Sequence, residues 1–315
     1  MDEAAVTPCP ASQREAALRG LHAAVTAGHQ AMLAAAIAAA PDDPSTWNGL
    51  LVAPTADGAD GFASLWVQPL PGRAALVWPP PPGAPAEAAL YRAAARRLDS
   101  CGTAVAQIIV DPDDGFEPTR MAELGFPHLA DLIYLAADAD SSVAPADADL
   151  HFASVDRDDL DEFAALVEQT YLESLDCPPL DGVRSIDDVL AGYRAQGRYM
   201  PEHWYAVRVR GVAQPAAVVI LADHPDIQQW ELVYMGVAAS HRGRGIGRRI
   251  VQFVRRAAAR GGAQRVLLAV DAANWPALAV YQQAGFVEWG RRCVFARLTQ
   301  RAAARDLAIG PRERR

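Results

Sequence analysis

The apolar and polar positions between residues 150 and 286 change period regularly along the chain. Continuous or alternating apolar runs predict strands, and apolar residues three or four positions apart predict helices. One helix shows this spacing at Leu160, Phe163 and Val167, which form an apolar face. The predicted order is β-α-α-β-β-β-α-β-α-β, with strands at 150–155, 203–209, 216–221, 228–237 and 265–270, helices at 156–172 and 185–196, a helix ending at Gly261, and a helix from Asn274 to Gly285.

The first half of the chain repeats part of this pattern 160 positions earlier, without a gap from about Leu76 to Leu135. The matching pairs are Val110-Asp111 with Val270-Asp271, Cys101-Gly102 with Gly261-Gly262, and Gly125-Phe126 with Gly285-Phe286. An alanine-rich run from Ser12 to Ala40 precedes the repeat and predicts a helix ending at Pro41. Because 315 residues are many for one core, we expect domains at 1–140 and 150–299, a linker at 141–149 rich in alanine and aspartate, and a charged tail at 300–315.

A glycine-rich turn follows the strand at 228–237 and contains Gly243, Gly245 and Gly247. These glycines let the backbone turn into a helix whose first N–H groups and dipole favour an anion. The chain has no lysine, which a nucleotide P-loop requires, and Arg248 stands where a dinucleotide fingerprint has its third glycine. The sequence therefore predicts a pyrophosphate site of another kind.

A second motif begins at Asn274, which suits a helix cap, and continues through Ala277 and Tyr281 to a Gly-Phe pair. Together with the earlier pattern Arg242-x-x-Gly245-x-Gly247, it resembles the GNAT superfamily of acetyltransferases. The resemblance implies an α/β (α+β) protein with two tandem GNAT-like domains. Each is expected to be a mixed, mostly antiparallel sheet flanked by helices.

The same resemblance implies acetyl-CoA as co-substrate and assigns roles to residues of the second domain. Glu231, eleven positions before Arg242, is the expected general base, and Tyr281 is the expected acid that protonates the departing thiolate. Without the resemblance, Glu231 is an ordinary strand glutamate and Tyr281 is a packed helix aromatic. The expected cofactor-binding residues are Met235 and Val237 for the pantetheine arm, Arg242, Gly243, Arg244, Gly245, Ile246, Gly247 and Arg248 for the pyrophosphate, and Asn274.

The first domain lacks the counterparts of these groups. Opposite the glycine turn lies the proline-rich run 79–85, and proline has no N–H for a phosphate. Met121 stands opposite Tyr281, and Pro71 stands opposite Glu231. We therefore expect a degenerate domain that packs on the second one, shapes the acceptor cleft or provides a dimer face. Non-catalytic binding of an acyl-CoA is the remaining alternative for it.

Charge and composition narrow the partners. The chain carries a net charge of −9, yet eight arginines and no acidic residue lie between Glu231 and Asp271, which favours coenzyme A phosphates over nucleic acid. Four separated cysteines indicate reduced thiols and a cytoplasmic location. The histidines show no metal-ligand spacing, so no metal is expected. No run is apolar enough for a membrane span, and the N-terminal run does not fit a signal peptide.

The acceptor is expected to be an amine of a small molecule or peptide. The connection at 171–182 carries three acids that could attract a cationic amine, and Tyr193, Tyr199, Trp204 and Tyr234 are candidates for cleft walls or for simple packing. Tandem GNAT proteins of this length include mycothiol synthase, which acetylates a cysteinyl sugar amine. The alternatives outside the enzyme class are a non-catalytic acyl-CoA-binding or regulatory protein and a structural scaffold.

Overall fold

The computed structural model describes residues 6–23, 25–40, 44–54, 62–142, 149–155 and 160–299. Most of the expected linker and the whole expected tail at 300–315 lie outside the described residues. Within the described part, no helix combines the length and the apolar character that a membrane span needs.

The N-terminal half begins with two helices where the sequence predicted one, because the chain turns between them. Its elements are β1 (Thr7–Pro8), α1 (Arg14–Ala23), α2 (Ala27–Ala39), β2 (Leu50–Pro54), β3 (Phe62–Leu70), β4 (Ala74–Trp78), α3 (Glu87–Ser100), β5 (Val105–Val110), α4 (Pro118–Glu123) and β6 (His128–Asp138).

The C-terminal half follows the predicted element order throughout. Its elements are β7 (Leu150–Ser154), α5 (Leu160–Tyr171), α6 (Ile186–Arg194), β8 (Trp204–Val209), β9 (Pro215–His224), β10 (Gln229–Val237), α7 (Ile246–Arg260), β11 (Arg265–Asp271), α8 (Trp275–Gln283) and β12 (Val287–Leu298). The repeat recurs in space from α3 onward, since α3, β5, α4 and β6 end within one residue of 160 positions before α7, β11, α8 and β12. Before α3 the offset is 155, because Leu76 of β4 pairs with β5 as Glu231 of β10 pairs with β11; Pro71, expected opposite Glu231, lies in the turn before β4.

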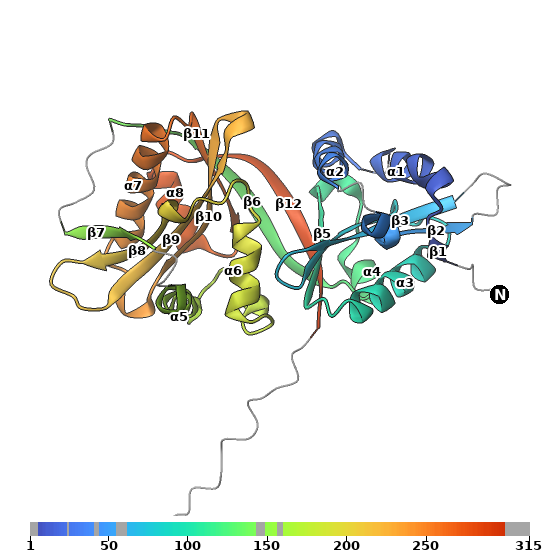
Figure 1. The fold of residues 1–315 in the computed structure, drawn as a ribbon, viewed down its shortest axis with the longest axis horizontal. Coiled ribbons are helices and arrows are strands. Elements are labelled where there is room, and N and C mark those ends of the chain that lie inside the picture. The colour runs from blue at the N-terminus through green and yellow to red at the C-terminus, as the bar shows by residue number, and fades with distance from the viewer. Residues whose placement is uncertain are drawn as a thin grey trace, which may run out of the picture.

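The described strands form one twelve-stranded sheet in the order β1-β2-β3-β4-β5-β12-β6-β11-β10-β9-β8-β7. Each half contributes its last strand to the other: β6 pairs with β11, and β12 pairs with β5. The two exchanged strands also pair with each other at the centre of the molecule, as Figure 1 shows. The division into domains at residues 1–140 and 150–299 stays a prediction. Because β6 and β12 are exchanged, each of these two ranges supplies a strand to the sheet of the other.

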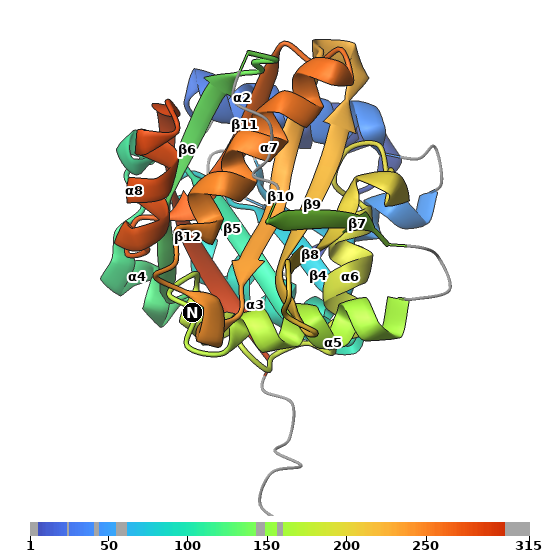
Figure 2. The same ribbon diagram turned by 90° about the vertical axis from the view of Figure 1, so that its left-hand side faces the viewer.

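Helices cover both faces of the sheet in the C-terminal half. On β9, Val219 and Leu221 pack in the core that contains the apolar residues of α7. Val218 and Ile220 point the other way, into a core with α5. Figure 2 shows α7 lying along β10 and β11, with α5 crossing the lower end of the strands. This alternation follows from the two-residue period of a strand, which places successive side chains on opposite faces.

Candidate active site

Two neighbouring strands separate next to Glu231. The parallel pairing of β10 with β11 covers only Gln229, Trp230 and Glu231, whereas β9 pairs with β10 as far as Val237. The register of the β9 pairing shifts between Leu232 and Tyr234, as a β-bulge does. Beyond Glu231 the edge of β10 that faces β11 therefore keeps backbone N–H and C=O groups for a ligand. Met235 and Val237 lie on this edge segment.

The glycine turn leads directly from this strand into α7. Gly243 and Gly245 have φ angles of 73° and 71°, which favour glycine. Helix α7 begins at Ile246, and the N–H of Arg249 donates to the carbonyl of Gly245. The N–H groups of the first turn have no intrahelical acceptor and lie at the positive end of the helix dipole. The side chains of Arg244 and Arg248 are exposed beside them. This arrangement can hold a pyrophosphate.

Arg242 differs from the other residues of the turn because its guanidinium binds protein carbonyls. Its Nε donates to the Val237 carbonyl at 3.0 Å. Its two terminal nitrogens donate to the carbonyls of Thr170 at 3.0 Å, Leu172 at 2.7 Å and Glu173 at 2.9 Å. These last carbonyls lie at the end of α5 and just after it, where a cation also complements the helix dipole. Arg242 thus fastens the glycine turn to α5.

The first turn of α7 lies against both β10 and α8. A Cβ placed on Gly247 would lie 3.8 Å from the methyl groups of Val280 and 4.0 Å from Met235 Cε. Asn274 begins α8, and its side chain accepts the N–H of Ala277 at 3.3 Å, as a helix cap does. Gly236 permits a closer approach, since a Cβ there would lie 2.4 Å from Thr170 Oγ1. The sequence did not single out Gly236.

Tyr281, on α8, is buried and packs 5.7 Å from the ring of Phe286. Burial raises the pKa of its phenol, and the charge of Asp176 raises this pKa further. The hydroxyl therefore keeps its proton at neutral pH, as a general acid requires.

Glu231 forms a pair with a histidine that the sequence analysis missed. His224 Nε2 lies 2.9 Å from Glu231 Oε2, and both side chains are about 30% exposed. The hydrogen bond to Glu231 raises the pKa of His224, against a smaller lowering by burial. In the β9–β10 hairpin His224 is opposite Gln229, two positions before Glu231. The register of the β9–β10 hairpin is the signal in the sequence that could have revealed this diagonal pair of His224 and Glu231.

The connection between α5 and α6 is bound to the end of β11. Asp271 Oδ2 accepts the N–H of Cys177 at 3.2 Å, and Asp176 Oδ1 accepts the N–H of Asp271 at 3.4 Å. Burial, with the nearby charges of Asp176 and Asp271, raises the pKa of the Cys177 thiol to about 12, so it stays protonated.

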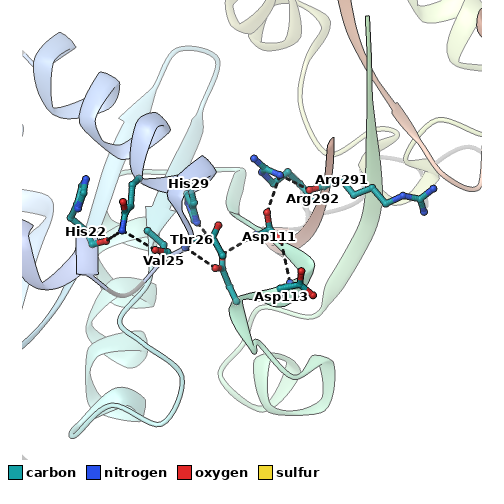
Figure 3. Close-up of polar contacts among 10 residues, drawn as sticks. His22, Val25, Thr26, His29, Asp111, Asp113, Arg291 and Arg292 are labelled. Carbon is teal, nitrogen blue, oxygen red and sulfur yellow. Dashed lines mark hydrogen bonds and ion pairs between the residues drawn. The ribbon is translucent and has the colours of Figure 1, made fainter. Parts of the chain in front are cut away.

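The N-terminal half keeps an equivalent anchor between its first two helices and the end of β5. Asp114 Oδ1 accepts the N–H of Thr26 at 2.9 Å, and Asp114 Oδ2 lies 3.4 Å from Nδ1 of the buried His29. Figure 3 shows Thr26 and His29 beside Asp111 in this cluster. The two halves thus fasten their first two helices from different positions of the repeat, because Asp114 aligns with Asn274 and not with Asp271.

The aromatic candidates for the cleft wall divide into two groups. Tyr193 and Tyr234 stack at 5.5 Å, and the hydroxyl of Tyr193 lies 2.7 Å from that of Tyr171. Trp204 instead is 1% exposed and packs in the core, with Tyr199 against its edge at 5.3 Å. The structure thus brings Tyr193 and Tyr234 together beside the end of α5 and places Trp204 among core residues.

The proline-rich run 79–85 replaces the glycine turn in the N-terminal half, and a carboxylate fills the helix start behind it. Glu87 opens α3 and accepts the N–H of Gly83 at 3.2 Å. Arg120 donates to the same carboxyl group from Nε and Nη2, at 3.1 and 3.0 Å. A phosphate at this helix start would therefore have to displace the carboxylate of Glu87. The proline-rich sequence alone did not reveal this carboxylate.

Comparisons with known proteins agree with this arrangement. The family model described as acetyltransferase (GNAT) family matches residues 168–286. The similarity to GNAT acetyltransferases thus lies in the C-terminal half of the chain. A mycothiol acetyltransferase from Corynebacterium efficiens is 39% identical over 72 residues, which cover 23% of this chain and 24% of that relative.

Solved structures show a similar fold over most of the chain. A GCN5-related N-acetyltransferase from Sphaerobacter thermophilus matches with a TM-score of 0.62 and 15% identity, covering 95% of this chain and 96% of its own. A functionally unknown conserved protein from Staphylococcus epidermidis matches with a TM-score of 0.53 and 12% identity, covering 78% and 94%. The predicted α/β fold with GNAT-like halves is confirmed.

Proposed function

We propose that the C-terminal half transfers an acetyl group from acetyl-CoA to an amine of a small molecule or peptide. The observation that carries the proposal is the separation of β10 from β11 immediately after Glu231. The glycine turn joins β10 to α7, and Tyr281 lies in the same core as residues of both elements, which supports one extended ligand along the free edge of β10. The family match supports acetyl-CoA as the donor.

The roles of the side chains follow from their surroundings. The turn from Gly243 to Arg248 binds the pyrophosphate, and the free edge of β10 at Met235 and Val237 aligns the pantetheine arm. Holding the two reactants together supplies a large part of the rate enhancement. Glu231 accepts the proton that the amine loses, and Tyr281 donates a proton to the sulfur as its bond to the acetyl carbon breaks.

A mycothiol-type acceptor is the second candidate within the enzyme class. Its support is the stretch of 72 residues that is 39% identical to the Corynebacterium efficiens relative. Because that stretch covers 24% of the relative, it does not select the acceptor. An amine on a cysteinyl sugar is therefore one member of the acceptor panel.

The test measures release of free CoA from acetyl-CoA with a panel of amines, together with the mass of the product. Tyr281→Phe should lower turnover by about 100-fold or more, with little change in the affinity for acetyl-CoA. Tyr91→Phe is the matched control, because Tyr91 is equally buried but lies on α3 in the other half. Tight CoA binding without turnover of any amine would favour a non-catalytic acyl-CoA-binding protein.

A further inference from the structure

An uncovered stretch of the sheet lies beside Glu231. Ala269 is exposed where β11 has separated from β10 and is paired only with Tyr134 of β6. Leu267 and Tyr134 are only half-buried on the adjacent positions. We call this the central face, formed by Leu267 and Ala269 of β11, Tyr134 and Ala136 of β6, and Val287 and Trp289 of β12.

The strand registers connect the central face to the candidate base. Glu231 is opposite Leu267, Leu267 is opposite Ala136, and Ala136 is opposite Val287. Directly paired residues place their side chains on the same face of a sheet. The central face therefore continues from Glu231 across both exchanged strands.

Trp289 lies at an irregular position that exposes its side chain. The pairing of β12 with β6 shifts between Glu288 and Gly290, so Trp289 is the extra residue of a bulge. Its side chain is 56% exposed, and its ring meets that of Tyr134 edge to face at 5.4 Å. Two aromatic rings, one contributed by each half of the sequence, thus form an open platform.

Arg292 supports this platform from the N-terminal side. Its guanidinium carbon lies 5.8 Å from the centre of the Tyr134 ring, and Nη1 donates to Asp111 Oδ2 at 3.3 Å. Figure 3 shows Arg292 directed toward Asp111 while its neighbour Arg291 points the opposite way. Arg292 is 9% exposed, so its position is fixed by packing as well as by charge.

Two charges of opposite sign act on Tyr134. Burial raises the pKa of its phenol, Arg292 lowers this pKa and Glu231 raises it, so Tyr134 lies within the field of both groups. Tyr134 lies two strand spacings across and two residues along from Glu231, about 12 Å, and Trp289 lies three spacings across and two residues along, about 16 Å. A ligand that joins the base to the platform therefore has two linked units, an amine and a ring.

We propose that Tyr134 and Trp289 form an acceptor subsite that binds the ring of a ring-bearing amine while its amino group meets Glu231. Arg292 is a positioning residue for Tyr134. The inference rests on the proposed acetyltransferase function and adds to it the class of acceptor. A sugar and an aromatic group share the flat ring face that stacks on tryptophan, and the experiment distinguishes them.

Three acceptors with the same amino group provide the test: N-glycyl-glucosamine, glycine anilide and glycine ethylamide, which has no ring. Trp289→Ala should raise KM about tenfold for the preferred ring-bearing amine and leave kcat/KM for glycine ethylamide unchanged. Trp289→Phe should recover most of the loss. Because Trp289 is exposed, the affinity for acetyl-CoA should not change in either variant.

Arg292→Gln should raise the same KM with little change in kcat, and Arg291→Gln is the matched control on the other face of β12. Equal effects of Trp289→Ala on all three amines, or none on any, would overturn the subsite while acetylation itself persists. If the unaltered protein acetylates none of the three amines but binds acetyl-CoA, both the subsite and the proposed function are overturned.

Discussion

Replacing Arg242 by alanine separates a structural role from a role in cofactor binding. The change removes four hydrogen bonds that join the glycine turn to Val237 and to three carbonyls at the end of α5. Two of them, to Leu172 and Glu173, are exposed to water and contribute little. The two half-buried bonds, to Val237 and Thr170, contribute about 1 kcal/mol each.

The expected loss in the free energy of unfolding is thus about 2 kcal/mol. For a cooperative unit of 150–250 residues this lowers Tm by about 4–8 °C, measured by thermal unfolding without ligand. Arg244→Ala is the matched control, because Arg244 is an exposed arginine on the same turn. It should leave Tm unchanged and weaken acetyl-CoA binding about two- to fivefold, measured by calorimetry.

The opposite pattern would refute this reasoning. If Arg242→Ala keeps its Tm within about 1 °C and weakens acetyl-CoA binding as Arg244→Ala does, the guanidinium binds the cofactor and not α5. If Arg242→Ala loses both stability and affinity for acetyl-CoA, added acetyl-CoA should restore part of the Tm, since a ligand stabilises the state that binds it.

Four further results are expected. The acetylation rate should rise as pH increases through the pKa of His224, which lies above the usual 6.5, because loss of its proton frees Glu231 from an ion pair; His224→Gln should remove this inflection from the pH profile. The raised pKa of His224 also means that its protonated form stabilises the fold at pH values below 6.5. This stabilisation should be lost as the pH rises through the pKa that His224 has in the folded protein. Gly236→Ala should cost about 1–3 kcal/mol in a denaturant titration, because the added Cβ would meet Thr170 Oγ1, Thr170 Cβ and Tyr234 Oη; an unchanged midpoint would contradict the close contact. Residues 150–299 expressed alone should not unfold cooperatively, because β11 and β12 lose β6 between them; a cooperative transition at the Tm of the full chain would contradict the exchange.

The local parts of the candidate site could be predicted from the sequence. Gly243 and Gly245 adopt the positive φ angles that only glycine tolerates well, so their spacing alone indicated the turn. Asn274 caps its helix as its residue type predicts. The role of Arg242 was not visible, because an arginine in a phosphate motif and an arginine on helix carbonyls look the same in a sequence.

The amino-acid sequence by itself determined the element order of the C-terminal half, the glycine turn and the 160-residue repeat, because backbone periodicity and helix ends depend on residues close together in the chain. Only the tertiary structure decided which strands pair. The exchange of β6 and β12, the pairing of His224 with Glu231 and the filling of the N-terminal helix start by Glu87 each depend on which edge or charge another segment leaves free. Such choices are made by packing and hydrogen bonding across the fold, and no local pattern records them.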